Sequence, residues 1–477
     1  MTSHRAESPA GQQARLPLIL CLGLLVGCQG GLLLADRSTG GSEGHQEAGP
    51  RPCGPDSGTC SGLCIDGSCI GVCIPGARRC TGPIPQTCSA SGQWEDGAAC
   101  PHGCQEGNCD AAREAGPGDG GRDSPPITGV TYYVSPTGLD SNPGTQSQPW
   151  KTIKKAADTM VAGDAVQILA GTYHEQVVPL NSGSPGKPIT YLAAPGTAVI
   201  DGTGLTLSSG GYGEGMIQLT GKSHIVIRGL TIKNSAVHGI SVTSATNVEL
   251  AENTILNTHT AAIKVNQSQN IRIRDNTIKH VLYSSGIGVW TSEHVLVDHN
   301  FIDTPHWYHE CQGAHEEGLS IASVNHFEVA YNTLDYSETP PAGYCSNSQR
   351  LGIDVKESSQ DGLVHHNEVR NMDAAGIYVD GWHAGANGTP TLNHINIYQN
   401  KVSSGGGIVV GCEQADGVVE HINIYNNLVM NVRFSGIQVR GAWGDGLRKN
   451  ITIYNNTVYG ANPAGGHGGA GIYVTTS

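Results

Sequence analysis

A short motif recurs throughout the second half of the chain: a glycine or alanine, then two aliphatic residues one position apart, and an asparagine further on. The copies are Gly239-Ile240-Ser241-Val242, Ala262-Ile263-Lys264-Val265, Gly286-Ile287-Gly288-Val289, Gly318-Leu319-Ser320-Ile321, Gly352-Ile353-Asp354-Val355, Gly376-Ile377-Tyr378-Val379, Gly407-Ile408-Val409-Val410, Gly436-Ile437-Gln438-Val439 and Gly471-Ile472-Tyr473-Val474. The asparagines are Asn253, Asn276, Asn300, Asn332, Asn367, Asn400, Asn427 and Asn456. The shortest intervals are 23 to 24 residues. A repeat of that length with strand-like alternation predicts a solenoid, in which each repeat forms one coil.

The composition fits many short strands joined by tight turns. Of 477 residues, 67 are glycine, while charged residues make up only 14% and aromatic residues 5%. The formal net charge of -14 argues against nucleic acid as a partner, because phosphate binding requires a basic surface.

The first 27 residues read as an export signal. Two arginines precede an apolar run, residues 16–26, that is too short to span a bilayer. The run ends in Leu25-Val26-Gly27-Cys28, which resembles the lipobox of bacterial lipoproteins. That resemblance implies acylation of Cys28, and Gln29 after it implies sorting to the outer membrane. The alternative is an ordinary secretory signal, and either way the mature bacterial chain is exported, as a lipoprotein or at the cell surface.

Cysteine usage agrees with export. Ten of the 15 cysteines lie between Cys53 and Cys109, which predicts a small disulfide-rich module whose connectivity the sequence does not define. A zinc site is the alternative, although no Cys/His pairs show zinc-finger spacing. Residues 28–52 are expected to form a flexible tether, and residues 110–128 a second linker.

The large domain, residues 129–477, opens with three short stretches and one amphipathic helix. The stretches are Tyr132-Tyr133-Val134-Ser135-Pro136-Thr137-Gly138, Pro149-Trp150-Lys151-Thr152-Ile153 and Gly171-Thr172-Tyr173-His174-Glu175. The helix is expected over roughly Lys151 to Met160, covering the open end of the first coil. This opening resembles right-handed parallel β-helix proteins of the pectate-lyase-like superfamily, particularly polysaccharide lyase family 9. The resemblance implies an all-β fold with three short parallel strands per coil, in a carbohydrate context.

Several structural expectations follow. The recurring asparagines should stack as a hydrogen-bonded ladder inside a turn. Insertions at residues 306–315 and 338–350 each carry one cysteine, which predicts a Cys311–Cys345 disulfide and leaves Cys412 buried or unpaired. Because the chain stops just past Val474 without a capping segment, we expect it to be truncated or covered by something else at that end.

The motif also predicts which side chains face outward together. With the aliphatic residues pointing inward, the third and fifth positions should form a shelf along the solenoid. Coil by coil these are Ser241 and Thr243, Lys264 and Asn266, Gly288 and Trp290, Ser320 and Ala322, Asp354 and Lys356, Tyr378 and Asp380, Val409 and Gly411, Gln438 and Arg440, and Tyr473 and Thr475. Charge and aromatic rings concentrate in the middle of this shelf.

Such a shelf suits a linear polysaccharide. Its expected substrate-binding residues are Lys264, Trp290, Tyr378 and Trp382. A lyase removes the proton next to a uronate carboxyl group with a base of lowered pKa, for which Lys356 is the candidate. Arg440 would bind the substrate carboxylate, and Asp354 and Asp380 would bind Ca²⁺. The alternative is a surface ion-pair cluster.

The strand Ile353-Asp354-Val355-Lys356-Glu357-Ser358-Ser359 also resembles the lysine-bearing strand of polysaccharide lyase family 6. The resemblance implies that Lys356 is the base. The family's acidic pair ahead of the lysine is absent here, and its arginine on the next coil is replaced by Tyr378 and Asp380. The calcium motif of family 9 is reduced to Val379-Asp380-Gly381-Trp382.

Three functions are therefore open. The first is a surface-anchored lyase that cleaves an acidic, uronate-containing polysaccharide as a monomer, held to the outer membrane by its lipid. The second is a glycoside hydrolase of the same fold, with paired carboxylates from Asp354, Asp380, Glu316 and Glu317. The third is a lipoprotein that binds carbohydrate or acts in adhesion without catalysis.

Overall fold

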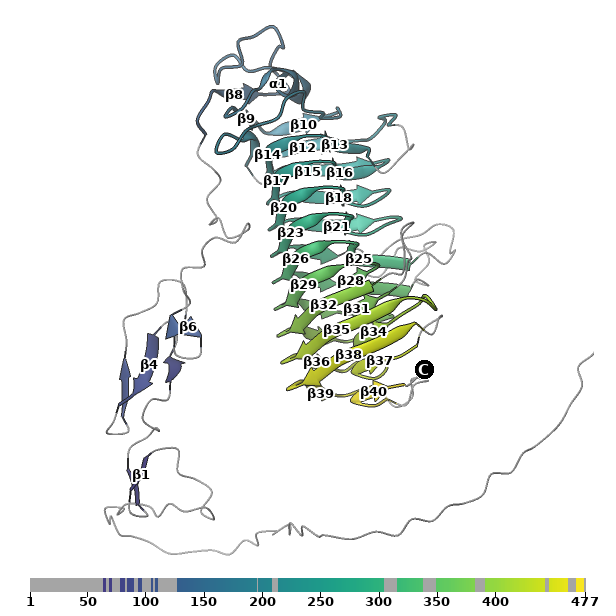
Figure 1. Cartoon of the computed structure of the whole chain (residues 1–477). Helices are drawn as coiled ribbons and strands as arrows, with labels where there is room; N and C mark the ends of the chain where they lie inside the picture. Colours follow the sequence, from purple (N-terminus) through teal and green to yellow (C-terminus); the bar gives the residue numbers. More distant parts are fainter. Residues whose placement is uncertain are drawn as a thin grey trace, which may run out of the picture. The chain divides into compact units, whose positions relative to one another are not determined.

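Three parallel β-sheets form the large unit of the chain, and each coil contributes one strand to each sheet (Figure 1). The computed structural model describes residues 127–475 except positions 195, 208–212, 304–314, 338–348, 382–390, 442–445 and 462–468, together with short segments between residues 63 and 109. The parallel sheets confirm the predicted all-β solenoid with three strands per coil.

The strands are as follows. The 12-stranded sheet contains β8 (Thr131–Val134), β9 (Ala165–Ile168), β11 (Ile189–Ala193), β14 (Ser223–Arg228), β17 (Thr246–Ala251), β20 (Gln269–Arg274), β23 (Glu293–Asp298), β26 (Asn325–Ala330), β29 (Gln360–His365), β32 (Thr391–Tyr398), β35 (Val418–Tyr425) and β38 (Leu447–Tyr454). The 11-stranded sheet contains β10 (Gly171–Tyr173), β12 (Ala198–Asp201), β15 (Thr231–Ser235), β18 (Thr254–Thr258), β21 (Thr277–Val281), β24 (Phe301–Asp303), β27 (Thr333–Asp335), β30 (Glu368–Arg370), β33 (Lys401–Ser403), β36 (Leu428–Met430) and β39 (Thr457–Tyr459). The 10-stranded sheet contains β13 (Gly215–Thr220), β16 (His238–Thr243), β19 (Ile263–Asn266), β22 (Ile287–Trp290), β25 (His315–Ala322), β28 (Gln349–Lys356), β31 (Ala375–Asp380), β34 (Ile408–Gly411), β37 (Ile437–Val439) and β40 (Ile472–Val474).

The repeated motif supplies the 10-stranded sheet and one wall of the core. Its aliphatic residues, such as Ile240 and Val242, are fully buried, and each contributes roughly 1.5–3 kcal/mol by leaving water. The small residue before them stands at a tight corner. A Cβ on Gly239 would come within 2.6 Å of the Ala262 carbonyl oxygen, which explains the glycine in this coil.

The asparagines form a continuous ladder, as predicted. Asn332 shows the pattern: its Oδ1 accepts the backbone N–H and the Nδ2 of Asn300, both at 3.0 Å. Its own Nδ2 donates to the carbonyl oxygen of Val297 at 2.8 Å and to Oδ1 of Asn367 at 3.0 Å. Every rung from Asn253 to Asn427 is almost fully buried, so these coils depend on their neighbours for their polar groups to be satisfied.

The predicted helix is present as α1 (Ile153–Thr159) and lies at the N-terminal end of the coil stack (Figure 1). Thr152 caps it, because its side chain accepts the backbone N–H of Lys155. The face formed by Ile153, Ala156 and Ala157 is buried, which confirms the predicted amphipathic pattern.

The first unit, Met1–Ala111, contains short antiparallel strands. They are β1 (Leu63–Ile65) with β2 (Ser68–Ile70), β3 (Arg78–Thr81) with β4 (Ile84–Cys88) and β5 (Trp94–Asp96), and β6 (Cys104–Gln105) with β7 (Asn108–Cys109). The predicted disulfides of this module and the lipidation site Cys28 lie outside the part of the chain that the structure describes.

The ladder generates a stability prediction. Asn332→Ala removes the acceptor of two Asn300 donors inside the core, and we expect the free energy of unfolding to fall by about 2–3 kcal/mol. Asn456→Ala is the matched control, because this last rung makes the same kinds of bond but is only half-buried, so water replaces them. Denaturant unfolding measures both variants, and equal losses would show that the ladder does not act through burial.

Candidate functional site: a buried carboxyl cluster

The third and fifth motif positions align along the 10-stranded sheet as predicted. In order, the third positions are Ser241, Lys264, Gly288, Ser320, Asp354, Tyr378, Val409, Gln438 and Tyr473. The fifth positions run through Thr243, Asn266, Trp290, Ala322, Lys356, Asp380 and Gly411. Strand pairing therefore brings Lys356 next to Asp380 in the adjacent coil.

The prediction of a solvent-exposed shelf is wrong for its middle. Asp354, Asp380, Lys264 and Lys356 are only 2 to 7% exposed. Part of the reason is the close stacking of coils, which lets each outward side chain cover its neighbour. Tyr378 is also buried, where it packs against an apolar group on this side of the sheet that consists of Leu351, Ala375 and Val409. It is therefore not an open platform for a sugar ring.

Lys356 lies between two carboxyl groups. Its Nζ contacts Oε1 of Glu317 and lies 3.2 Å from Oδ2 of Asp354. Glu317 belongs to β25, one coil before Lys356, and its other oxygen accepts the hydroxyl of Ser285 at 3.2 Å. We call Glu317, Asp354, Asp380 and Lys356 the carboxyl cluster.

Charge balance separates the protonation states of the two carboxyls that contact Lys356. Two buried carboxylates beside one ammonium would leave a buried negative charge, so one carboxyl keeps a proton. Burial raises the pKa of Asp354 to about 7, and the charge of Glu317 adds to this although Lys356 opposes it. For Glu317, burial acts in the same direction, but Lys356 outweighs it and holds the pKa below its ordinary value.

Asp380 is a third acid in this environment. Burial, followed by the charges of Asp354 and Glu413, raises its pKa to about 9, against the effect of Lys356. The Tyr378 hydroxyl donates to Oε1 of Glu413 at 2.8 Å, so Glu413 is held beside this group. Asp380 therefore retains its proton at neutral pH.

Lys356 does not have the lowered pKa that the lyase interpretation expected of its base. Burial disfavours its charged form, but Asp354 and Glu317 outweigh that effect and raise the pKa above its ordinary value. Lys356 therefore remains an ammonium ion at neutral pH. It is suited to holding a carboxylate in its ionised form and unsuited to accepting a proton.

The lysine with a lowered pKa is Lys264. Its Nζ lies 3.5 Å from the centre of the Trp290 ring, so Trp290 presents that face to a cation and not to a sugar. Burial lowers the pKa of Lys264 to about 7; the charge of Glu317 opposes the shift and that of Lys356 favours it. The two predicted binding residues are thus brought together with each other.

The remaining predicted site residues either lie away from the carboxyl cluster or fall outside the part of the chain that the structure describes. Arg440 follows β37, and its backbone N–H donates to Val410, which places it two coils beyond Asp380. Trp382, Cys311, Cys345 and the side chain of Glu316 lie outside the described part of the chain. Cys412 is buried and unpaired, as predicted.

The described residues do not fit the expected Ca²⁺ site. Calcium takes six to eight oxygen ligands from ionised carboxylates, carbonyls and water. Oδ1 of Asp354 and Oδ1 of Asp380 have no hydrogen-bond partner within the described part of the chain, which a cation would satisfy. However, the Lys356 ammonium already occupies the cation position between Asp354 and Glu317.

The sequence-based predictions include Glu317 only as one of the carboxylates of the hydrolase alternative. A signal for it exists, because it stands directly before the glycine of its motif copy. In that position the other copies carry His238, Ala261, Ser285, Leu351, Ala375, Gly406, Ser435 and Ala470. Glu317 is the acidic member of this column.

A shallow cleft of about 360 Å³ opens elsewhere on the solenoid. It is lined by Met372, Asp373, Ser404, Gly405, Asn431, Val432, Arg433 and Gly460. None of these residues belongs to the carboxyl cluster.

Two family models match the large unit. "Pel9A-like, right handed beta helix region" matches residues 132–285, and "Right handed beta helix region" matches residues 215–413. Together with the three parallel sheets, these matches decide the family. The large unit is a right-handed parallel β-helix of the pectate-lyase-like superfamily.

Individual relatives of this β-helix are distant. YwoF of Bacillus subtilis, described as uncharacterized, is 36% identical over 117 residues, which are 24% of this chain and 25% of that protein. The GH136 lacto-N-biosidase from Eubacterium ramulus is 14% identical, with 68% of each chain covered and a TM-score of 0.45. Pectate lyase Pel9A is 13% identical, with 70% of this chain and 79% of that chain covered and a TM-score of 0.38.

In the described part of the β-helix protein, no helix has both the length and the apolar character needed to cross a membrane.

The cluster makes stability depend on pH in a defined direction. Because the pKa of Asp380 is raised when folded, the folded chain binds more protons than the unfolded chain between about pH 4 and pH 9. Stability from this group is therefore present at low pH and lost as the pH rises. Asp380→Asn should gain stability relative to the wild type, on the order of 1–3 kcal/mol, between about pH 5 and pH 9.

Denaturant unfolding of both proteins across that range measures the difference. A difference that stays constant with pH would show that Asp380 ionises normally in the folded chain.

Proposed function

We propose that the protein hydrolyses glycosidic bonds in a carbohydrate polymer, with the carboxyl cluster as its reaction centre. The observation that supports this is the separation of proton affinities within one group of acids. Asp380 holds a proton at neutral pH, whereas Glu317 is ionised beside Lys356. Acids whose environments push their pKa values apart can supply the proton donor and the proton acceptor of hydrolysis.

Strand register brings the acids of the cluster into neighbouring positions. Asp354 and Asp380 are diagonal neighbours on adjacent parallel strands, since Lys356 pairs with Asp380 and Asp354 lies two positions earlier.

Each group then has a role in hydrolysis. Asp380 donates its proton to the glycosidic oxygen as the carbon–oxygen bond breaks. Glu317, which Lys356 holds as a carboxylate, accepts a proton from the water that attacks the sugar carbon. The carbohydrate context is supported by the matched family model and by the opening segment that resembles polysaccharide lyase family 9.

The experiment is a panel of neutral and uronate-containing polysaccharides, with Ca²⁺ or a chelator present. New reducing ends and ultraviolet absorbance from unsaturated products are measured in parallel. We expect reducing ends without unsaturated products, and a loss of at least ~100-fold in Asp380→Asn and Glu317→Gln. Asp335→Asn is the matched control, because this buried acid pairs with Arg370 on a different sheet. The Asp335→Asn variant should retain the activity of the wild type.

A lyase is the second candidate, favoured by Lys264. With a pKa near 7, its amine can remove the proton next to a uronate carboxyl group, after which the bond to the leaving oxygen breaks and that oxygen takes a proton. Unsaturated products that disappear in Lys264→Met and persist in Asp380→Asn would establish this reaction and overturn hydrolysis. Binding of a polymer without any cleavage, in every cation condition, would overturn both and favour an adhesion role.

We also propose that the protein is exported and anchored by a lipid on Cys28. The support is the lipobox-like Leu25-Val26-Gly27-Cys28 and the cysteine-rich segment behind it. Expression in a bacterium fed labelled fatty acid should label the full chain and not Cys28→Ser. Equal labelling of both would contradict the anchor.

A further inference from the structure

A column of turn residues runs along the 12-stranded sheet, away from the carboxyl cluster. Each member occupies the second position of its strand or an equivalent position, and each has a left-handed φ of 52 to 55°. The column contains His224, Asn247, Asn270, His294, His326, Asp361, His394, His421 and Asn450. We call it the turn column.

Backbone conformation explains only part of this composition. Asn, Asp and His tolerate the left-handed region better than other residues with a side chain. Asparagine meets that requirement at Asn247, Asn270 and Asn450. The turn does not require an imidazole, so the run of histidines in the middle of the column admits a chemical explanation.

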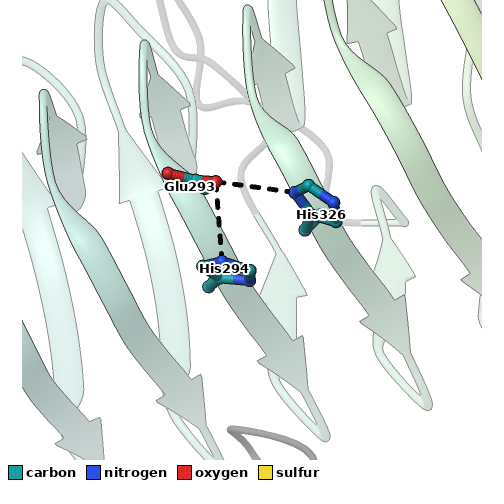
Figure 2. Close-up of side chains that lie close together, drawn as sticks. All are labelled: Glu293, His294 and His326. Carbon is teal, nitrogen blue, oxygen red and sulfur yellow. Dashed lines mark ion pairs between the residues drawn. The ribbon is translucent and has the colours of Figure 1, made fainter.

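Two of these histidines converge on a carboxylate. Figure 2 shows Glu293 and His294 side by side on β23, with His326 on the neighbouring strand β26. Oε1 of Glu293 lies 3.5 Å from Nε2 of His294 and 3.7 Å from Nδ1 of His326. The three potential ligand atoms all lie within 4.8 Å of one another.

These separations are close to those of a tetrahedral metal site. With zinc–ligand bonds of about 2.1 Å, tetrahedral ligand atoms are roughly 3.4 Å apart. Both separations from Glu293 are already near that value. The two imidazole rings are stacked with their centroids 4.9 Å apart, so binding an ion between them requires the rings to rotate. The side chains are 38 to 53% exposed, so they have room to turn and a fourth position stays open to water.

A further carboxylate stands behind His326. The second ring nitrogen of His326, Nε2, lies 3.8 Å from Oδ2 of Asp361. The other oxygen of Asp361, Oδ1, lies 3.3 Å from Nδ1 of His394. Metal-binding histidines commonly donate their other ring N–H to a carboxylate, which fixes the ring and strengthens the ligand. Asp361 is placed to accept a hydrogen bond from Nε2–H of His326 when Nδ1 of His326 binds a metal.

We propose that Glu293, His294 and His326 bind one divalent transition-metal ion of the zinc class, with Asp361 orienting His326. Two imidazoles and one carboxylate suit Zn²⁺, Cu²⁺ or Ni²⁺, whereas Ca²⁺ and Mg²⁺ prefer sets of oxygen ligands. The site lies on a different sheet from the carboxyl cluster, so it is independent of the proposed hydrolysis.

Titration of the full chain with ZnCl₂ by calorimetry tests the site, and the absorption spectrum of bound Co²⁺ reports its geometry. We expect one site with the spectrum of tetrahedral Co²⁺, weakened at least ~10-fold in His326→Asn and Glu293→Gln. Asp361→Asn should weaken it by about 10-fold as well. Asparagine is used because it already occupies this turn in three other coils, so the backbone should be unaffected.

His224→Asn is the matched control, since it removes an imidazole from the turn column but outside the proposed metal site. It should bind Zn²⁺ with the affinity of the wild type. Three results would overturn the proposal: no zinc binding by the wild type, unchanged affinity in His326→Asn, or equal weakening in His224→Asn. Circular dichroism of each variant shows that the fold is retained.

Discussion

In-register stacking of coils is the constraint on which the whole molecule depends. Residues at equivalent positions in neighbouring coils lie about 4.8 Å apart, whatever their type. Aliphatic residues at such positions exclude water together, and the asparagines satisfy one another's amides. The same spacing forces charged residues into contact, so a column can hold opposite charges or protonated acids but not a run of like charges.

The carboxyl cluster is a consequence of that rule. Coils elsewhere in the same columns carry Ser241, Val409 or Gly411, which stack without charge. Burying three acids and an ammonium costs desolvation that an apolar column avoids, so the cluster does not exist for stability. Its arrangement has instead a chemical result: protons stay on Asp380 at neutral pH while Glu317 is ionised.

Local periodicity allowed much of the fold to be predicted. The inward aliphatic positions, the ladder through Asn332 and the helix beginning after Thr152 all follow from patterns within one or two coils. The register of Lys356 beside Asp380 was also predictable, because equivalent motif positions must pair.

The chemistry of the site was less predictable. Lys356 and Glu317 are 39 residues apart, and their contact depends on where a longer coil returns to the sheet. That contact reverses the pKa shift expected for Lys356. Lys264 is the lysine with the lowered pKa, because burial lowers it by more than the charge of Glu317 raises it. Burial and the neighbouring charges, which together decide these two shifts, depend on neighbours that a motif does not specify.

The left-handed turn of the 12-stranded sheet has a consequence for how this protein can change. Asparagine, aspartate and histidine are all accommodated there, and their codons differ from one another only in the first base. One nucleotide substitution can therefore exchange an amide, a carboxylate or an imidazole on the surface at little backbone cost. The turn column is a row of positions where new ligands can be acquired during evolution before the coil beneath them has to adapt.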